Sequence, residues 1–272
     1  MPLSKLQSTL LKLLANQRNP ESYVAGGIAL NRDGPRQSRD IDIFHDRGAN
    51  LVATAEADVS TLRGAGFDVT WLDEKGAGRR SAIVRKGGDS TILEWISDAD
   101  YRFFPTQADE TFGFVLHPVD LATNKASAAA DRRVPRDIVD LLTIHETILP
   151  LGAVVNAAVG RFPGTTPEQM LAEIVRNSRF TAEEFQSLAT DMPLDPSGLH
   201  RRIRAMIEDA EAFLKELSSD DVGIVFMKDG RVMQPDPSQR SHYVRHRPAP
   251  RGSWPSSSEI GTAMLERYRE TG

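Results

Sequence analysis

The sequence predicts an α/β (α+β) fold, in which a small mixed sheet with flanking helices precedes a mainly helical part. Runs with strand character are concentrated in the first 116 residues, whereas apolar residues recur at helical spacing between residues 117 and 217. The 272 residues are 40% hydrophobic and 26% charged. These values are ordinary for a globular chain that forms one large domain or two modest ones.

The first 116 residues are expected to alternate between helices and strands. Helices are predicted at 3–14, where leucines recur at helical spacing, at about 28–30 after two glycines, and at 52–64. Strands are predicted at 23–25, 40–44, 67–72, 81–85, 91–96 and 112–116. The tetrapeptide Lys86-Gly87-Gly88-Asp89 indicates a hairpin turn between the strands at 81–85 and 91–96.

The remaining chain is expected to be helical as far as residue 217. Helices are predicted at 117–130 and 136–149, followed by three more within 167–217, the last opened by Asp195-Pro196. An isolated hairpin at 223–234, an extended arm or loose loop at 235–258 and a short helix near 259–269 should follow. The predicted domains are 1–116 (α/β), 117–220 (helical) and 221–272 (hairpin, arm and terminal helix).

Composition excludes several classes of protein. The sequence has no cysteine, which rules out disulfide scaffolds, thiol catalysis and zinc sites with cysteine ligands. Its start lacks the apolar region of a signal peptide, and the most apolar run, 148–160, is shorter than the ~20 residues of a bilayer span. We therefore expect a cytoplasmic protein with no membrane partner. The net charge of −5 argues against a dedicated duplex-DNA binder.

Two carboxylates in one predicted strand are the first candidate for chemistry. Asp40 and Asp42 are two residues apart, so both side chains project from the same face of the strand. Their apolar neighbours Ile41, Ile43 and Phe44 place the pair in a buried strand, where unpaired charge is costly. A divalent cation such as Mg²⁺ would relieve the repulsion between them.

Two glycines at a strand-to-helix junction are the second candidate. Gly26 and Gly27 follow the predicted strand at 23–25 and would let the backbone approach a ligand closely, for instance a phosphate. A tight turn is the structural alternative for the pair taken alone. Together, the glycines and the acidic strand provide phosphate contacts and metal ligands a short distance apart in the sequence.

These motifs resemble a known signature. Gly26-Gly27, a spacer and Asp40-Ile41-Asp42 are similar to the signature of nucleotidyltransferases of the DNA polymerase β superfamily. The run Arg36-x-Ser38-x-Asp40-Ile41-Asp42 more closely resembles the AbiEii-type nucleotidyltransferases, the toxin class of type IV toxin–antitoxin systems. The family's later motifs are matched by Val115-Leu116-His117-Pro118-Val119-Asp120-Leu121-Ala122-x-x-Lys125 and Arg136-Asp137-x-x-Asp140-Leu141. The resemblance covers residues 20–145, and the stretch after 150 matches nothing.

The resemblance implies catalytic roles for five residues. Asp40 and Asp42 would bind two Mg²⁺ ions, and Glu94 is our candidate for a third ligand, because four large apolar residues flank it. The alternatives for Glu94 are a place on the exposed face of an edge strand or an arginine partner such as Arg85 across the hairpin.

Lys125 would be the phosphate cation, and it follows Leu121 and Ala122 by four and three residues, so it shares the helical face that the apolar pattern turns inward. Asp140 would orient Lys125 or take part in catalysis, unless it forms an ion pair with the arginine four residues before it.

The resemblance also implies the substrates and partners. The nucleotide, an NTP, would contact Gly26, Gly27, Arg36, Ser38 and Lys125. The family transfers a nucleoside monophosphate to RNA, which is tRNA in its studied branches, and an antitoxin protein would be a further partner. The basic stretch at 228–251 is a candidate RNA contact or a disordered tail. The alternatives are transfer to a small molecule resembling an aminoglycoside and a non-catalytic nucleotide-binding or interaction module.

Overall fold

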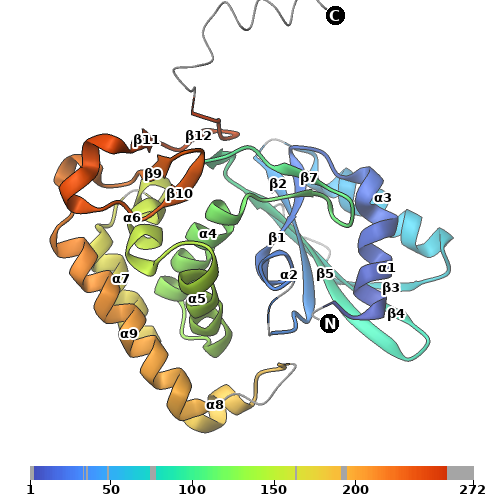
Figure 1. The fold of residues 1–272 in the computed structure, drawn as a ribbon. Helices are drawn as coiled ribbons and strands as arrows, with labels where there is room; N and C mark the ends of the chain where they lie inside the picture. The colour runs from blue at the N-terminus through green and yellow to red at the C-terminus, as the bar shows by residue number, and fades with distance from the viewer. Residues whose placement is uncertain are drawn as a thin grey trace, which may run out of the picture.

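A computed structural model of the chain describes residues 3–255 except 33, 35, 48, 74–77, 163 and 191–194. The helix predicted near 259–269 therefore lies outside the described residues. Within them, a sheet with flanking helices is followed by a helical region, which confirms the predicted fold class (Figure 1).

A seven-stranded mixed sheet is the centre of the N-terminal half. Its strand order is β3-β4-β5-β2-β1-β8-β7, and the β2–β5 and β1–β8 pairs are parallel while the other neighbours are antiparallel. The parallel β2–β5 pair sets Asp42 opposite Glu94. The strands are β1 (Ser22–Ala25), β2 (Asp40–Asp46), β3 (Asp68–Asp73), β4 (Arg79–Lys86), β5 (Asp89–Asp98), β7 (Gln107–Asp109) and β8 (Gly113–Val115).

The two faces of the sheet differ because successive side chains of a strand point in opposite directions. One face packs against α1 (Lys5–Leu14) and α3 (Leu51–Gly64) through a buried core that includes Ile41 and Ile43 of β2. The alternate residues of β2 lie on the other face, next to the short helix α2 (Gly26–Leu30). Figure 1 shows the helical region on this second side. The acidic residues of β2 therefore face the helices.

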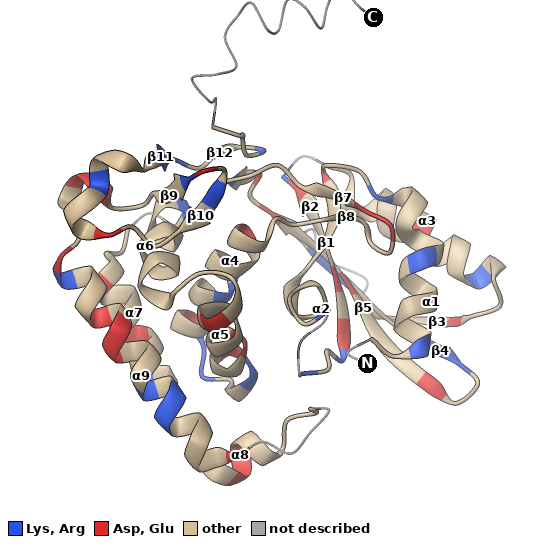
Figure 2. Ribbon diagram, viewed as in Figure 1, with Lys and Arg blue, Asp and Glu red and all other residues tan. Residues whose placement is uncertain are grey.

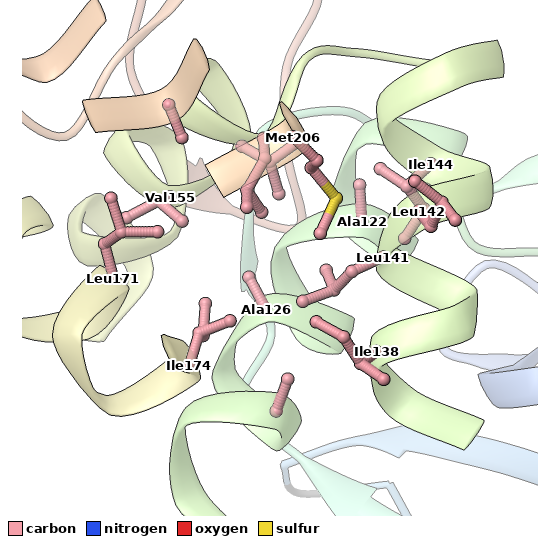
Figure 3. Packing of buried hydrophobic residues seen from close by; sticks show 14 of the residues in the cluster. Ala122, Ala126, Ile138, Leu141, Leu142, Ile144, Val155, Leu171, Ile174 and Met206 are labelled. Carbon is pink, nitrogen blue, oxygen red and sulfur yellow. The ribbon is translucent and has the colours of Figure 1, made fainter. Parts of the chain in front are cut away.

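Among the described residues of the second half, six α-helices bury their own apolar core. Ala122, Ala126, Leu141, Val155 and Met206 belong to this core, which Figure 3 shows from close by. Asp195 caps the last helix by accepting hydrogen bonds from the backbone of Ser197 and Gly198, as its Asp-Pro start predicted. The helices are α4 (Pro118–Asp131), α5 (Pro135–Thr147), α6 (Leu151–Arg161), α7 (Pro167–Asn177), α8 (Ala182–Gln186) and α9 (Pro196–Lys215).

The hairpin near the C-terminus is not isolated, contrary to the prediction. Strands β9 (Val225–Lys228) and β10 (Arg231–Met233) form it, and β11 (Val244–His246) adds a third strand beside β9. Arg245 on β11 lies with Nη2 2.7 Å from Oδ1 of the fully buried Asp221. A buried carboxylate is costly without a cationic partner, and this pairing stabilises the folded-back segment.

The prediction of a loose arm at 235–258 is also wrong for the part that the structure describes. Its strand β12 (Ala249–Pro250) pairs with β6 (Tyr101–Arg102) in a two-stranded sheet. Beyond it, Trp254 packs on Phe104 with ring centroids 5.1 Å apart. Backbone pairing and aromatic contacts thus hold this segment against the rest of the molecule.

No single helix in the described ranges is long and apolar enough to cross a bilayer. The pair α5 and α6 passes the length and composition test together, but the two helices are bent by 112°. Both contribute their apolar residues to the helical core.

Candidate functional site

Three acidic side chains line one cavity between the sheet and the helices. Asp40 and Asp42 come from β2, and Glu94 comes from the neighbouring position on β5. The cavity has a volume of about 370 Å³ and is also lined by Gly26 and Gly27. Figure 2 shows acidic positions on β2 and β5, with both signs of charge on α4 and α5 across from them. The predicted acidic and glycine motifs thus meet in one place.

The two glycines lie so close to side chains of the candidate site that a larger residue would not fit there. Gly26 has φ +69°, and a Cβ added there would lie 1.9 Å from Oδ2 of Asp42. A Cβ on Gly27 would lie 2.7 Å from Nη2 of Arg36 and 3.0 Å from Oγ of Ser38. Any larger residue would displace the carboxylate or the guanidinium. The glycine pair is therefore more than a tight turn, because it lets the backbone pass directly against the acidic strand.

Asp40, Asp42 and Glu94 form a row of carboxyl groups, called the acidic row below. Their mutual repulsion disfavours the ionisation of all three. Burial, together with repulsion from Asp40 and Glu94, raises the pKa of Asp42 to about 7. Lys125 and Arg136 act in the opposite direction but do not cancel the effect. A cation that enters the cavity would stabilise the ionised form of Asp42 and so lower its pKa.

The acidic residues provide a suitable donor set for Mg²⁺, which binds through carboxylate oxygens and substrate phosphates. As the side chains stand, however, no three His, Asp or Glu side chains in the described part of the chain are arranged so that they could hold a metal ion. Asp40 accepts a hydrogen bond of 2.8 Å from the Ser38 hydroxyl, and Glu94 pairs with Arg79. The residue types fit the ion, and a rotation of Asp40 and Glu94 would be needed to gather them.

Lys125 lies on the helix side of the cavity and is fixed by two aspartates. Its Nζ is 3.0 Å from Oδ2 of Asp140 and 3.3 Å from Oδ1 of Asp137. Lys125 is 8% exposed, which agrees with the prediction that its helical face points inward. Asp140 therefore lies where it could orient Lys125, and its role, in orientation or in catalysis, stays a prediction.

Asp140 also anchors the loop that leads into β2. Its carboxylate accepts two hydrogen bonds from Arg36, at 2.8 and 2.9 Å, and one of 3.0 Å from Asn31. Burial raises the pKa of Asp140, but Lys125 and Arg36 outweigh it and hold the value below the ordinary one. The alternative ion pair with Arg136 is wrong, because that side chain turns toward Asp40 instead, at 3.8 Å.

Sequence reasoning missed the arginine that holds Glu94. Arg79 begins β4 and sits opposite Ile96, from where its guanidinium reaches the Glu94 carboxylate. The suggested partner, Arg85, lies further along β4 and contacts Asp68 instead, at 3.6 Å. Arg79 lies two residues before the strand predicted at 81–85, and no local pattern marks it. Its contact with Glu94 depends on the register of the β4–β5 pair.

Seven further lining residues also went unassigned: Phe44, Ile96, Leu121, Asn124, Ala128, Arg132 and Arg136. Arg132 and Arg136 flank the start of α5, and Arg136 was part of a quoted motif without a role of its own. Phe44 and Ile96 lie beyond the acidic row on β2 and β5. The period of two that placed Asp40 and Asp42 on one face could have identified Phe44 as a lining residue.

Solved structures share this architecture. The chain aligns with MenT4, a nucleotidyltransferase toxin from Mycobacterium tuberculosis, with a TM-score of 0.54 and 17% identity over 79% of this chain and 83% of that one. The chain has a nucleotidyltransferase fold. A nucleotidyltransferase candidate from H. pylori is a more distant match, with a TM-score of 0.46 and 16% identity over 79% of this chain and 99% of that one.

This likeness confirms the fold that the motif resemblance implied. No protein-family model matches the sequence, and no curated protein matches it. With identities this low, the fold likeness does not extend to substrate or acceptor, and any function must be argued from the residues in the cavity.

Proposed function

We propose that the protein is a metal-dependent nucleotidyltransferase that moves a nucleoside monophosphate from an NTP to an acceptor. The observation that carries this proposal is the single cavity in which Asp40, Asp42 and Glu94 face Lys125 beside the glycine pair. Acidic and basic groups on opposite walls suit a ligand that carries both a cation and phosphates. The nucleotidyltransferase fold is consistent with this chemistry.

The wall of the cavity that carries Lys125, Arg132 and Arg136, called the helix wall below, would bind the triphosphate. Lys125 is held rigidly by Asp137 and Asp140, so its ammonium loses little further freedom when it meets a phosphate oxygen. Arg132 and Arg136 line the same wall, with side chains 48% and 36% exposed and therefore accessible to a ligand. Arg36 and Ser38 shape the floor beside Gly27. These groups would stabilise the charge of the departing pyrophosphate.

The acidic wall would hold two Mg²⁺ ions through Asp40, Asp42 and Glu94. When bound, such ions neutralise the triphosphate and make an acceptor hydroxyl more acidic. In the transfer, the acceptor hydroxyl gives up its proton to water or to a carboxylate of the acidic row and its oxygen bonds to the α-phosphorus. The bond from that phosphorus to the bridging oxygen of the β-phosphate breaks, and pyrophosphate leaves with that oxygen. The burial and the repulsion from Asp40 and Glu94 that raise the pKa of Asp42 also favour the uptake of a cation beside it.

We propose RNA, with tRNA as the first candidate, as the acceptor, and a toxin role with a partner antitoxin, from the motif resemblance to AbiEii-type enzymes. The basic stretch at 228–251 is a weaker candidate contact than the sequence suggested. Arg240 and Arg245 in it pair with the buried Asp221, and Arg251 pairs with Glu21. These carboxylates offset part of the positive charge of the stretch, so its net charge is smaller than its own residues suggest.

The experiment is an incubation with each labelled NTP, Mg²⁺ and either total tRNA or an aminoglycoside. Label on tRNA would support the RNA acceptor, and label on the aminoglycoside would identify a small-molecule transferase instead. Binding of NTP without transfer to either acceptor would favour a non-catalytic nucleotide-binding module. A Lys125→Ala variant, with Lys215→Ala on the exposed side of α9 as its matched control, tests whether the label depends on this cavity.

A further inference from the structure

The cavity has a second, apolar end beyond the acidic row. Along β2 and β5, the pair Phe44 and Ile96 follows the pair Asp42 and Glu94, about 7 Å further on. Leu121, one helical turn before Lys125 on α4, lines the same end. A ligand with its phosphates at Lys125 and the acidic row would therefore place its uncharged part between apolar surfaces.

The aromatic ring at this end is held in place. Phe44 stacks on Tyr23 of β1, with ring centroids 6.4 Å apart and an angle of 16° between the planes. Tyr23 is 1% exposed and sits directly opposite Phe44 in the β1–β2 register. A ring fixed in this way can contact a planar ligand without losing further side-chain freedom.

One polar side chain that lines the same cavity has a defined orientation. Asn124 on α4 lines the cavity, and its Oδ1 lies 2.5 Å from Nη1 of Arg161. Arginine can only donate hydrogen bonds, so the atom of Asn124 that meets it must be the carbonyl oxygen. The amide Nδ2 is then the group that remains, and it has no hydrogen-bond partner among the residues that the structure describes. Asn124 thus offers a donor to the cavity.

Arg161 is built to keep Asn124 in this orientation. Its side chain is 3% exposed, its Nε donates to the backbone oxygen of Tyr101 at 3.0 Å, and its Nη1 donates to Oγ1 of Thr123 at 2.8 Å. Nη1 also lies 3.2 Å from the backbone oxygen of Asp120, so three contacts fix the guanidinium. A flipped Asn124 amide would set its Nδ2 donor against the Nη1 donor at 2.5 Å, which favours the orientation with the carbonyl oxygen toward Arg161. Arg161 acts here as a positioning residue.

We infer that this end of the cavity is a nucleobase subsite, an inference that rests on the proposed function. The base lies against Phe44, Ile96 and Leu121, and Asn124 Nδ2 donates to a carbonyl oxygen on its edge. Uracil, cytosine and guanine carry such an oxygen and adenine does not. The subsite therefore favours UTP, CTP and GTP over ATP by about tenfold, the effect of one unmade hydrogen bond at a buried edge.

The test is an equilibrium competition of the four NTPs and inorganic tripolyphosphate against a fluorescent nucleotide, with Mg²⁺ present and no acceptor. The wild type is expected to bind the three carbonyl-bearing nucleotides about tenfold more tightly than ATP. Asn124→Ala should weaken these three to the level of ATP and leave ATP and tripolyphosphate within twofold. Gln186→Ala, an exposed change on α8, is the matched control and should change nothing.

A second variant tests the apolar surface and does not depend on Asn124. Phe44→Leu should weaken all four nucleotides several-fold while tripolyphosphate binds as before, because the phosphate end is untouched. Equal weakening of tripolyphosphate in either variant would overturn the inference, since it would indicate damage to the whole cavity. Unchanged discrimination in Asn124→Ala, or four equal affinities in the wild type, would also overturn it. A wild type that binds neither nucleotides nor tripolyphosphate would instead refute the proposed function itself.

Discussion

The pKa values of two aspartates on opposite walls of the cavity, the half-buried Asp42 and the fully buried Asp140, are shifted in opposite directions. On the wall formed by β2 and β5, called the sheet wall, burial and the neighbouring carboxylates raise the pKa of Asp42 to about 7. On the opposite wall, formed by α4 and α5, Asp140 is buried more fully, but Lys125 and Arg36 hold its pKa below the ordinary value. Burial alone thus does not decide the charge of a carboxylate here, because the partners do.

The two walls differ in whether their buried charge has partners within the protein. Asp140 has two cationic partners and an amide donor within the protein, so it serves as a scaffold for Lys125. The sheet wall lacks a comparable set of cations around Asp42 among the described residues. A protein that leaves such repulsion in place loses stability, and function is the usual reason.

Replacing Asp42 should have the largest effect. Asp42→Asn is expected to reduce nucleotide transfer by about 10³-fold or more, because it removes the central oxygen ligand of the acidic row. The measurement is single-turnover transfer with the acceptor that the labelling experiment identifies. Asp68→Asn, at an exposed position of β3, is the matched control. Full activity in Asp42→Asn would refute the metal site proposed here.

The same variant should be more stable than the wild type at high pH. A raised pKa means that the folded state keeps its proton longer, so stability is present below pH 4 and is lost as pH rises toward 7. Without divalent cations, Asp42→Asn should gain about 1–4 kcal/mol in the free energy of unfolding at pH 8 and nothing near pH 3. Urea unfolding across this pH range measures it, and a constant difference would contradict the assigned titration.

Removing the cation of the helix wall should have the next largest effect. Lys125→Ala is expected to weaken NTP binding by about 10- to 100-fold, the range for a hydrogen bond to a charged group. The fold should survive, because Asp140 keeps Arg36 and Asp137 keeps Arg132 as partners. Isothermal titration with NTP and Mg²⁺ measures the change, and an unaltered affinity would make Lys125 purely structural.

A third test separates backbone strain from a clash with the acidic wall. Gly26→Ala should cost about 2–4 kcal/mol in the free energy of unfolding, because its Cβ would meet Oδ2 of Asp42 at a positive φ. Gly66 has a similar φ of +79° with nothing within 4 Å, so Gly66→Ala should cost only about 1 kcal/mol. Thermal unfolding compares the two, and equal costs would show that the contact with Asp42 is unimportant.

The smallest effect is expected for the arginine at the rim of the sheet wall. Arg79 is 61% exposed where it pairs with Glu94, and exposed ion pairs contribute less than about 1 kcal/mol. Arg79→Ala should therefore change the free energy of unfolding by less than that and leave tripolyphosphate affinity within twofold. A loss of several kcal/mol would mean that Glu94 depends on Arg79 as strongly as Asp140 depends on its partners.

Much of the sheet wall was predictable because the direction of a side chain in a strand depends only on its position along that strand. A strand repeats every two residues, so the spacing of Asp40 and Asp42 is enough to place both on one face. Glu94 could be nominated from its apolar neighbours, but its position opposite Asp42 depended on the parallel pairing of β2 with β5. That pairing joins segments about 50 residues apart, which no local pattern records.

The C-terminal segment shows where composition misled. A stretch rich in proline, serine and arginine indicates a loose arm, yet Arg245 and Trp254 hold it against the body. The partners that decide this, Asp221 and Phe104, lie outside the stretch and give no sign of it in the sequence. The division into three domains and the assignment of catalytic residues stay predictions.

Local residue patterns identify the chemical groups that the two walls can offer: carboxylates at strand spacing, a glycine pair and a lysine on an inward helical face. Which of these charges have partners within the protein depends on how distant segments pack. The pairing of Arg36 with Asp140 spans 104 residues and needs α5 to pack beside the loop before β2. Charges interact through space, so their protonation and partners depend on how distant segments pack, whereas side-chain direction along a strand or helix depends on neighbours alone.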